Sequence, residues 1–348
     1  MTAPIRRRST AAAIALTAGI TAGAALMLSA CGPDDPTADG ATPTATTSAA
    51  AGAGKGQGTG AKPIGSAAPV SSAPVNGTAH NGLTISDGSR YVVMNGTRVD
   101  FGTLVNDLSW SPDGSKAAFI DGDGDLAVSK PNGSGRVVVA KNPGGQTWSH
   151  PTWQVRPTDT QNGVPAVDNL LFSVTASGTS KLYSVKATAH QGTPTVLGLN
   201  GEPGGNEKPL PKTGNIWPNA AGSHGTAVYA NSGTGDVYIR DDYLRQQGWE
   251  LAPGSEPALA PGDNEDVVFV RSVNGHDHLF VEHSGNNGPT YKDITPNATT
   301  NYAEPAWSAN GSTIAARTPA GIVTVPADGS AAPVKVSGYH GLPAYRAS

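Results

Sequence analysis

From Leu83 onward the chain alternates between short apolar runs and clusters of turn-forming residues. The runs are rich in β-branched or aromatic side chains and are bounded by Gly, Asn, Asp or Pro, as in KAAFI, RVVVA, LLFSVTA, DVYIR, DVVFVRS and GIVTV. A sustained stripe with the 3.6-residue period of a helix is absent, and DDYLRQQ (241–247), which comes nearest to one, is too short to carry a domain. Many short strands separated by turns predict an all-β protein.

One stretch of this pattern recurs along the chain. LSWSPDGSKAAF (108–119) and PAWSANGSTIAA (305–316) match almost position for position: a Trp ends one short run, and a turn leads into the next. Weaker copies carry an anchor residue in the same slot, and the six anchors are Trp110, Trp153, Trp217, Leu259, Trp307 and Tyr345. Their spacings are 43, 64, 42, 48 and 38 residues. A period in the forties with four short strands per repeat is typical of β-propeller blades.

The two ends of the repeat region predict how the ring closes. Three residues follow Tyr345, too few for a further blade, and residues 83–105 precede the first anchor without an innermost strand of their own. We therefore expect the C-terminal strand to begin the blade that residues 83–105 complete. This arrangement removes the free sheet edges at the junction and gives a six-bladed propeller.

The repeat resembles that of a known family. WSPDGSKAAF and PAWSANGSTIAA are similar to the TolB-type propeller repeat, a six-bladed family common in exported bacterial proteins. The resemblance covers roughly residues 82–348; it is good at the blades of Trp110 and Trp307, moderate at Trp153, and weak at Trp217 and Leu259. It implies the fold and says little about function. TolB carries an extra N-terminal domain where this chain has a tether, so its partners are not carried over.

The anchor residues are expected in the core rather than in a ligand-stacking site. Each would end an inner strand and pack against the neighbouring blade. The residue before each anchor is mostly small, which suits the crowded inner end of a blade; these residues are Ser109, Thr152, Ile216, Ala258, Ala306 and Ala344. Trp148 is the aromatic residue left as a candidate for stacking on a sugar.

A candidate ligand site lies three residues before the anchors. Asp107, His150, Glu256 and Glu304 hold this position in four different repeats, while Gly214 and Leu342 hold it in the other two. Ring closure would bring them to one mouth of the central channel. Converging carboxylates would raise one another's pKa or hold a cation. The alternative is that they are solvated residues at the starts of strands.

Three other motifs are weaker candidates. The alternating acids Asp121, Asp123 and Asp125 imitate a calcium loop, but Leu126 stands where that loop has Gly and Asn132 where it has its closing acid. An acidic hairpin tip fits them better. His276 and His278 are spaced to share a metal but lack a third ligand. AGSHG (221–225) resembles a nucleophile elbow, yet it fills a turn between two strands rather than a strand-to-helix turn.

The N-terminus reads as a lipoprotein signal. A basic segment with Arg6, Arg7 and Arg8 precedes the apolar stretch 11–26, and LSAC (28–31) then matches the lipobox of bacterial lipoproteins. The resemblance implies cleavage before Cys31 and acylation of its thiol. A disulfide within the chain is impossible because Cys31 is the only cysteine, and a retained transmembrane helix is disfavoured because the apolar stretch is short. The remainder up to residue 79 is rich in Ala, Gly, Ser, Thr and Pro and predicts a disordered tether.

Composition restricts the function further. Removal of residues 1–30 takes away three Arg and no acid, which leaves 20 basic against 27 acidic residues. This balance argues against a nucleic-acid partner. We expect a signal peptide (1–30), a tether (31–79) and a monomeric propeller (80–348) at the outer face of the cell membrane, without a cofactor or catalytic constellation. It would bind a protein, peptide or cell-envelope component; the alternative is a propeller enzyme or a small-ligand or carbohydrate binder that uses the channel mouth.

Overall fold

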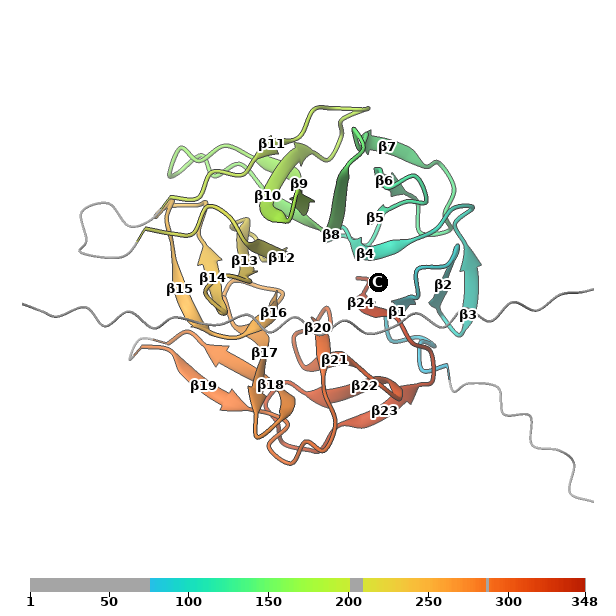
Figure 1. Ribbon diagram of the computed structural model, residues 1–348, viewed down its shortest axis with the longest axis vertical. Helices are drawn as coiled ribbons and strands as arrows, with labels where there is room; N and C mark the ends of the chain where they lie inside the picture. The colour runs from blue at the N-terminus through green and yellow to red at the C-terminus, as the bar shows by residue number, and fades with distance from the viewer. Residues whose placement is uncertain (1–75, 201–208, 286–287, 348) are drawn as a thin grey trace, which may run out of the picture. The chain divides into compact units, whose positions relative to one another are not determined.

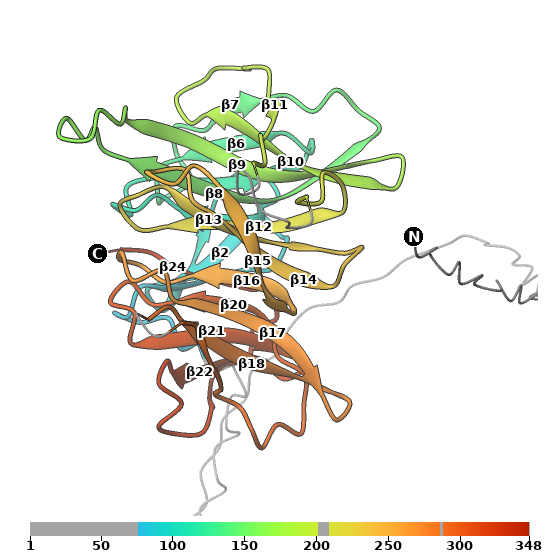
Figure 2. The same ribbon diagram turned by 90° about the vertical axis from the view of Figure 1, so that its left-hand side faces the viewer.

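The computed structural model describes residues 76–200, 209–285 and 288–347 of the chain. Within them lie 24 strands in six four-stranded antiparallel sheets. Figure 1 shows the sheets as blades of a ring around a central axis, and Figure 2 shows the same ring from the side. Across these residues we find no helix with the length and hydropathy that a membrane span requires. The predicted all-β, six-bladed propeller is therefore confirmed.

The blades are numbered in chain order, and each is given from its innermost strand outward. Blade 1 is formed by β24 (Leu342–Tyr345), β1 (Leu83–Ser86), β2 (Tyr91–Met94) and β3 (Thr97–Asp100). Blade 2 is formed by β4 (Asn106–Trp110), β5 (Ala117–Ile120), β6 (Leu126–Ser129) and β7 (Val137–Ala140). Blade 3 is formed by β8 (Gln146–Arg156), β9 (Val167–Ala176), β10 (Thr179–Lys186) and β11 (Thr195–Val196).

The other three blades follow the same order. Blade 4 is formed by β12 (Asn215–Ala221), β13 (Thr226–Asn231), β14 (Asp236–Arg240) and β15 (Gly248–Pro253). Blade 5 is formed by β16 (Ser255–Leu259), β17 (Val267–Val273), β18 (His276–His283) and β19 (Thr290–Asp293). Blade 6 is formed by β20 (Ala303–Trp307), β21 (Thr313–Thr318), β22 (Gly321–Pro326) and β23 (Val334–Ser337).

The recurring turn explains why the two best copies of the repeat look alike. In blade 2 the Gly114 N–H donates to the Ser111 carbonyl at 2.8 Å, and the Asp113 carboxylate accepts from the Ser115 N–H at 3.0 Å. Blade 6 makes the same pair of bonds through Gly311 and the Asn310 side chain. Both glycines have positive φ, at 65° and 71°, a conformation that other residues adopt only with strain.

Blade 1 is shared between the two ends of the folded region, as the sequence predicts. β24 lies antiparallel to β1 and pairs Tyr345 with Leu83 and Leu342 with Ser86. In Figure 1 the red C-terminal strand lies beside the blue β1. Beyond the strand, the Arg346 N–H donates to the Gly82 carbonyl at 2.8 Å. The ring is thus closed by a sheet whose strands lie far apart in the sequence.

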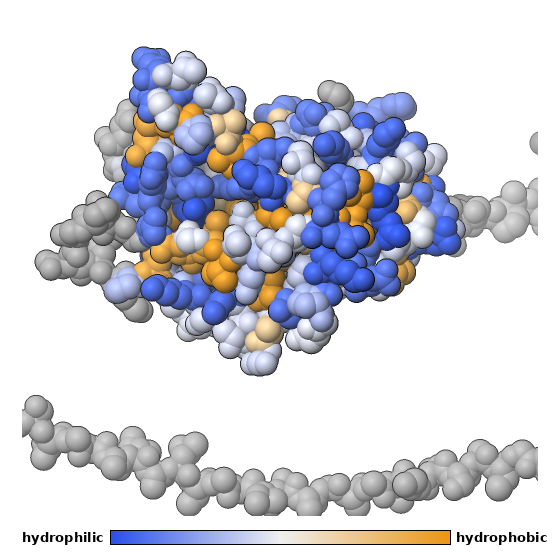
Figure 3. Space-filling model, turned by 90° about the horizontal axis from the view of Figure 1, so that it is seen from above, coloured by the Kyte–Doolittle hydropathy of each residue, from blue (hydrophilic) through white to orange (hydrophobic). Residues whose placement is uncertain are grey.

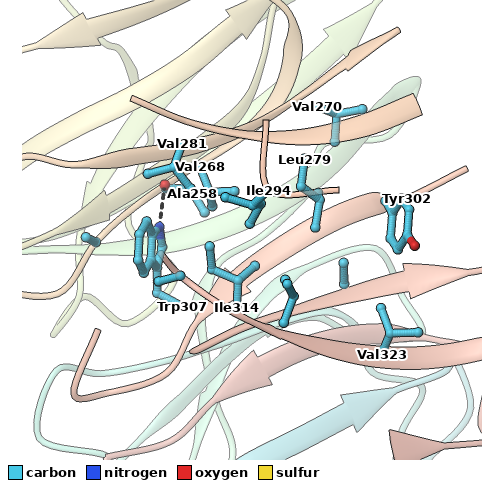
Figure 4. Packing of buried hydrophobic residues seen from close by; sticks show 14 residues of the cluster. Ala258, Val268, Val270, Leu279, Val281, Ile294, Tyr302, Trp307, Ile314 and Val323 are labelled. Carbon is cyan, nitrogen blue, oxygen red and sulfur yellow. Dashed lines mark hydrogen bonds between the residues drawn. The ribbon is translucent and has the colours of Figure 1, made fainter. Parts of the chain in front are cut away.

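The core lies between neighbouring blades. Figure 4 shows the contact of blades 5 and 6, where Trp307 packs with Val268, Val281 and Ile314 and donates its Nε1–H to the Ala258 carbonyl at 2.9 Å. Trp110, Trp153 and Leu259 are likewise buried in interblade clusters, at exposed fractions of 8%, 5% and 3%. Their predicted role as core anchors is confirmed. The outer edge of the ring near β7 and β11 mixes hydrophilic and hydrophobic side chains (Figure 3).

The prediction that the anchor residues lie in the interblade core is wrong for Trp217. The inner strands of blades 2 to 6 each contain a β-bulge, which falls between Ile216 and Asn219 in blade 4. Trp217 occupies the bulge, three residues before Ala220, which is the true counterpart of the anchors. The indole of Trp217 is therefore half-buried at the inner end of blade 4 rather than in an interblade core.

The packed region begins slightly before the expected domain start at residue 80. Thr78 is fully buried, and its Oγ1 accepts a hydrogen bond from the Gly96 N–H at 3.0 Å in the turn between β2 and β3. Cys31 and the signal and tether residues up to 75 lie outside the described residues.

Candidate functional site

Six side chains, one from the innermost strand of each blade, meet near the axis. We call them the axial ring; in order around the propeller they are Leu342, Asp107, His150, Trp217, Glu256 and Glu304. The structure therefore brings together all four of the ionisable residues predicted from the repeat. It adds Trp217 in the place expected for Gly214.

The bulge fixes these side chains in position. Asp107, His150, Trp217, Glu256 and Glu304 all have φ between 49° and 54°. Non-glycine residues adopt this region at a cost of about 1–3 kcal/mol each, and such strain is concentrated at ligand-binding and active sites. In blades 3 to 6 and in blade 1 the next residue is proline. A bulge tolerates proline in an inner strand because it interrupts the ladder bonds that need an N–H.

The axial ring lies between two cavities. The larger, which we call the axial cavity, has a volume of about 590 Å³ and is lined by all six ring residues together with the turns that follow the inner strands. A second cavity of about 500 Å³ is lined by the other ends of blades 1, 2 and 6. Asp107, Glu304 and Leu342 line both cavities. A volume of this size is typical of small-ligand sites.

Each ring carboxylate uses one oxygen to hold a neighbour in place. The Oδ2 of Asp107 accepts from the His150 N–H at 3.0 Å, and the Oε2 of Glu256 accepts from the Glu304 N–H. The Oε2 of Glu304 accepts from Arg317 Nε at 2.8 Å. Among the described residues, the second oxygens of Asp107 and Glu256 have no hydrogen-bond donor. These two oxygens are therefore open to a ligand.

His150 reaches across the ring. Its Nε2 lies 4.0 Å from the Glu304 Oε1 of the blade on the opposite side, and its Nδ1 lies 3.7 Å from Asp107 Oδ2. Both distances are ion-pair distances, too long for hydrogen bonds. Neither ring nitrogen has a hydrogen-bond partner in the described part of the chain, although both are buried from solvent. The imidazole also stands perpendicular to the Trp217 indole, with ring centroids 6.1 Å apart.

The electrostatics of the ring follow from this arrangement. Burial acts to lower the pKa of His150, but the carboxylates of Glu304, Asp107 and Glu256 outweigh it, so the pKa is raised. Burial raises the pKa of Glu256. The hydrogen bond from the Glu304 N–H acts to lower this pKa, whereas the negative charge of the Glu304 carboxylate acts to raise it, and the net pKa is raised. Burial acts to raise the pKa of Glu304, but His150 and Arg317 outweigh it, so the pKa is lowered. The ring thus favours a cation at its centre, and His150 supplies one when protonated.

A pattern in the sequence would have identified Trp217 as a member of the axial ring. Proline follows the ring residue in five blades, as Pro151, Pro218, Pro257, Pro305 and Pro343. Alignment on these prolines places Trp217 in the ring and Asn219 before the anchor slot. Asn219 is a better match there than the bulky Ile216, and its Oδ1 accepts from the Leu259 N–H of blade 5 at 2.9 Å.

The Asp121–Asp125 tract forms the tip of the β5–β6 hairpin. Asp121 and Asp125 are buried; Asp121 pairs with Arg136 at 2.7 Å and caps the turn, and Asp125 accepts from the Asn142 N–H at 2.7 Å. Their carboxylates thus bind groups of the protein. His278 pairs with Asp293 at 2.8 Å. No group of three or more His, Cys, Asp or Glu side chains suited to a metal ion occurs in the residues that the structure describes.

Two further candidates are placed away from a reactive arrangement. In AGSHG, Ser223 donates to Asp263 Oδ1 at 2.8 Å, whereas His224 stacks on Tyr243 with ring centroids 4.5 Å apart. The serine and histidine are therefore turned to different partners. Trp148, the aromatic candidate for stacking on a sugar, has an exposed fraction of only 6% and packs against Phe172, so it is not available for such a contact.

The fold and the ring define the protein as a six-bladed β-propeller with a ligand-sized axial cavity. No protein-family model matches the chain, and no curated protein matches its sequence. Among solved structures, it is similar to the β-propeller domain of Cps50 (Swd1) from Myceliophteria thermophila, with 10% identity, a TM-score of 0.48, and coverage of 79% of this chain and 92% of that one.

Two bacterial structures have comparable likeness. A protein of unknown function from Bacteroides caccae has 12% identity, a TM-score of 0.44, and coverage of 76% of this chain and 98% of that one. The calcium-binding protein regucalcin from Agrobacterium tumefaciens has 12% identity, a TM-score of 0.45, and coverage of 78% and 92%. At these identities the likeness extends to the propeller fold and no further.

Proposed function

We propose that the protein is a lipid-anchored binding module outside the cytoplasmic membrane, and that its ligand enters the axial cavity. One observation carries the choice of site: all six blades direct a side chain to one ring at the end of a cavity large enough for a ligand. The ligand would be part of a protein, a peptide or another component of the cell envelope. The lipobox-like LSAC segment supports anchoring through acylated Cys31.

Binding explains the site better than catalysis. General acid–base or nucleophilic chemistry needs a nucleophile and a base within hydrogen-bond reach of each other. Of the serine and threonine hydroxyls that line the axial cavity, Ser111 donates to Asp113, Ser223 donates to Asp263 and Thr152 accepts from the Ala220 N–H, while Ser109 has no hydrogen-bond partner among the described residues. His150 faces carboxylates and Trp217 instead. The alternative of a propeller enzyme at the channel mouth therefore has no arrangement of residues in its favour, whereas a channel ligand has the cavity.

The anchor can be tested by substitution of Cys31. In Cys31→Ala the acceptor thiol is absent, so the chain should stay uncleaved or leave the membrane for the soluble fraction. Cell fractionation and immunoblotting would measure this, with Ser29→Ala as a control that keeps the cysteine. Normal processing and full membrane retention of Cys31→Ala would contradict the proposal.

The site can be tested by photocross-linking in cells. Ala309 is exposed in the β20–β21 turn and lines the axial cavity, whereas Val334, on the outer strand of the same blade, has an exposed fraction of 62% and lies away from the cavity. A photoreactive p-benzoylphenylalanine at position 309 should give a discrete adduct, and the same group at 334 should give none. Adducts at 334 alone would place binding on the rim of the ring and overturn the channel site.

A further inference from the structure

The lining of the axial cavity is predominantly acidic, and His150 is its one basic side chain among the described residues. It includes the carboxylates of Asp107, Glu256, Glu304 and Asp263, and it includes no Lys or Arg. Arg317 approaches from the second cavity, but its guanidinium is paired with Glu304. A cavity with acidic walls and no fixed cation repels phosphates, carboxylates and other anions. It attracts a ligand with positive charge.

Two of the ring carboxylates keep one oxygen without a donor in the part of the chain that the structure describes. Asp107 and Glu256 both line the cavity, and each has one oxygen held by a backbone N–H while the other has no donor among the described residues. Glu304 Oε1 meets His150 only at 4.0 Å. Carboxylates of two other blades thus face the one cation that the protein itself provides here, the imidazolium of His150, which lies 3.7 Å from Asp107 and 4.0 Å from Glu304, too far for hydrogen bonds. An ammonium group has three donors and could satisfy them better.

The rest of the cavity suits an apolar stem. Its walls near the ring are the five prolines that follow ring residues, Pro151, Pro218, Pro257, Pro305 and Pro343, with Leu342 and the half-buried indole of Trp217. Proline and leucine offer no polar partner to a ligand, and an indole attracts organic cations through its π face. A bare metal ion would gain nothing from these walls. It would also need several oxygens at one point, and the described residues form no such group.

We infer that the axial cavity binds an organic ammonium group carried on an apolar stem, as in a lysyl side chain of a peptide. This inference rests on the proposed function and names its ligand class. The ammonium pairs with the carboxylates of Asp107, Glu256 and Glu304 beside His150, and the stem lies along Trp217 and the prolines. His150 therefore competes with the ligand whenever it is protonated.

The test uses the full-length chain in detergent and isothermal titration calorimetry. The probe is Nα-acetyl-lysine methylamide, and the matched neutral probe is the same compound acetylated on Nε. We expect only the charged probe to bind. Glu256→Gln with Glu304→Gln should weaken its binding by about tenfold or more, since truncation of a charge pair in a desolvated site has effects of this order. Glu250→Gln on β15, which removes an exposed carboxylate elsewhere, should leave binding unchanged.

Two further measurements separate ligand recognition from damage to the fold. Trp217→Leu keeps every charge and should still weaken binding several-fold by loss of the indole. Between pH 6 and pH 8.5 affinity should rise as His150, with its raised pKa, loses its proton, while the lysyl ammonium stays charged. The groups that face His150 are Asp107, Glu256 and Glu304, with Arg317 behind Glu304, and His150→Asn should leave only the smaller dependence that Glu256 contributes.

Three outcomes would overturn the inference. Equal binding of the two probes would remove the role of charge. Binding that survives the double substitution would place the amine elsewhere. Binding of calcium chloride, but not of the lysine probe, that depends on Glu256 and Glu304 would replace the ammonium by a metal ion while the channel site stands. The channel site itself fails only if the photoreactive group at position 309 gives no adduct.

Discussion

A chain truncated after residue 340 is expected to lose at least ~5 kcal/mol of unfolding free energy, which is about the whole stability of many domains. The truncation removes β24, so β1 becomes an unpaired inner edge whose side chains, including the fully buried Leu83 and Ile85, face solvent. Exposing a Leu or Ile costs about 1.5–3 kcal/mol, and each lost hydrogen bond about 0.5–1.5 kcal/mol. Urea and thermal unfolding followed by circular dichroism would measure the loss.

The control for this experiment is a deletion of the same length in the predicted tether. Removal of residues 51–58 takes away eight residues outside the propeller and should leave the unfolding midpoint unchanged. A second variant guards against a truncation that does not fold at all. Arg346→Ala keeps β24 but removes the Nε donor to the Gly114 carbonyl at 2.7 Å and the guanidinium over the Trp110 ring at 5.4 Å, so it should cost a smaller, measurable amount. Equal midpoints for the two deletions would refute closure through blade 1.

Trp307→Ala should cost about 3–5 kcal/mol of stability, and Trp217→Ala less than about 1 kcal/mol. Trp307 is 9% exposed, fills the space between blades 5 and 6, and donates to the Ala258 carbonyl (Figure 4). Its removal leaves a cavity and a carbonyl without its donor. Both indoles border the axial cavity, but that of Trp217 is only half-buried and stands against His150, so its removal mainly enlarges a space that already exists. Chemical unfolding of the two variants gives the comparison directly.

This pair of substitutions also tests the assignment of the axial ring. If Trp217→Ala costs as much as Trp307→Ala, then Trp217 is a core anchor, as the repeat first suggested, and the ring loses its aromatic member. Trp153→Ala serves as the reference for a core tryptophan in another blade, since its indole is 5% exposed.

The fold was predictable because it depends on features that repeat. Strand alternation, the Trp-turn-strand unit and the spacing of its copies were enough to predict the blades. The closure of the ring was predictable because residues 83–105 lack an innermost strand and the C-terminal strand lacks a blade of its own. Counting three residues back from each anchor identified four ring residues correctly because those anchors are structurally equivalent. The four are Asp107, His150, Glu256 and Glu304. In blade 4 the same count failed because Trp217 has the identity of an anchor and the position of a ring residue.

What the sequence could not supply is geometry finer than the repeat. The bulge that turns the ring residues toward the axis depends on strand register, and nothing in the residues marks it except the following prolines. The approach of His150 to Glu304 joins opposite blades, so no local pattern contains it. Thr78 is similar: in sequence it resembles the tether, and only its hydrogen bond to Gly96 shows that it belongs to the propeller.

The sharing of blade 1 also sets the order in which the molecule can be completed. β1 is the first strand of the ring to be synthesised and β24 the last, and the bond from Thr84 Oγ1 to the Ala344 carbonyl joins residues 260 positions apart. At a translation rate of about 5–20 residues per second, β1 waits on the order of tens of seconds for its partner. Blades 2 to 6 can form in turn during that interval, but the ring stays open. Until then the sheets that have formed are held in an open chain whose two ends are not joined. The ring closes only when β24 pairs with β1.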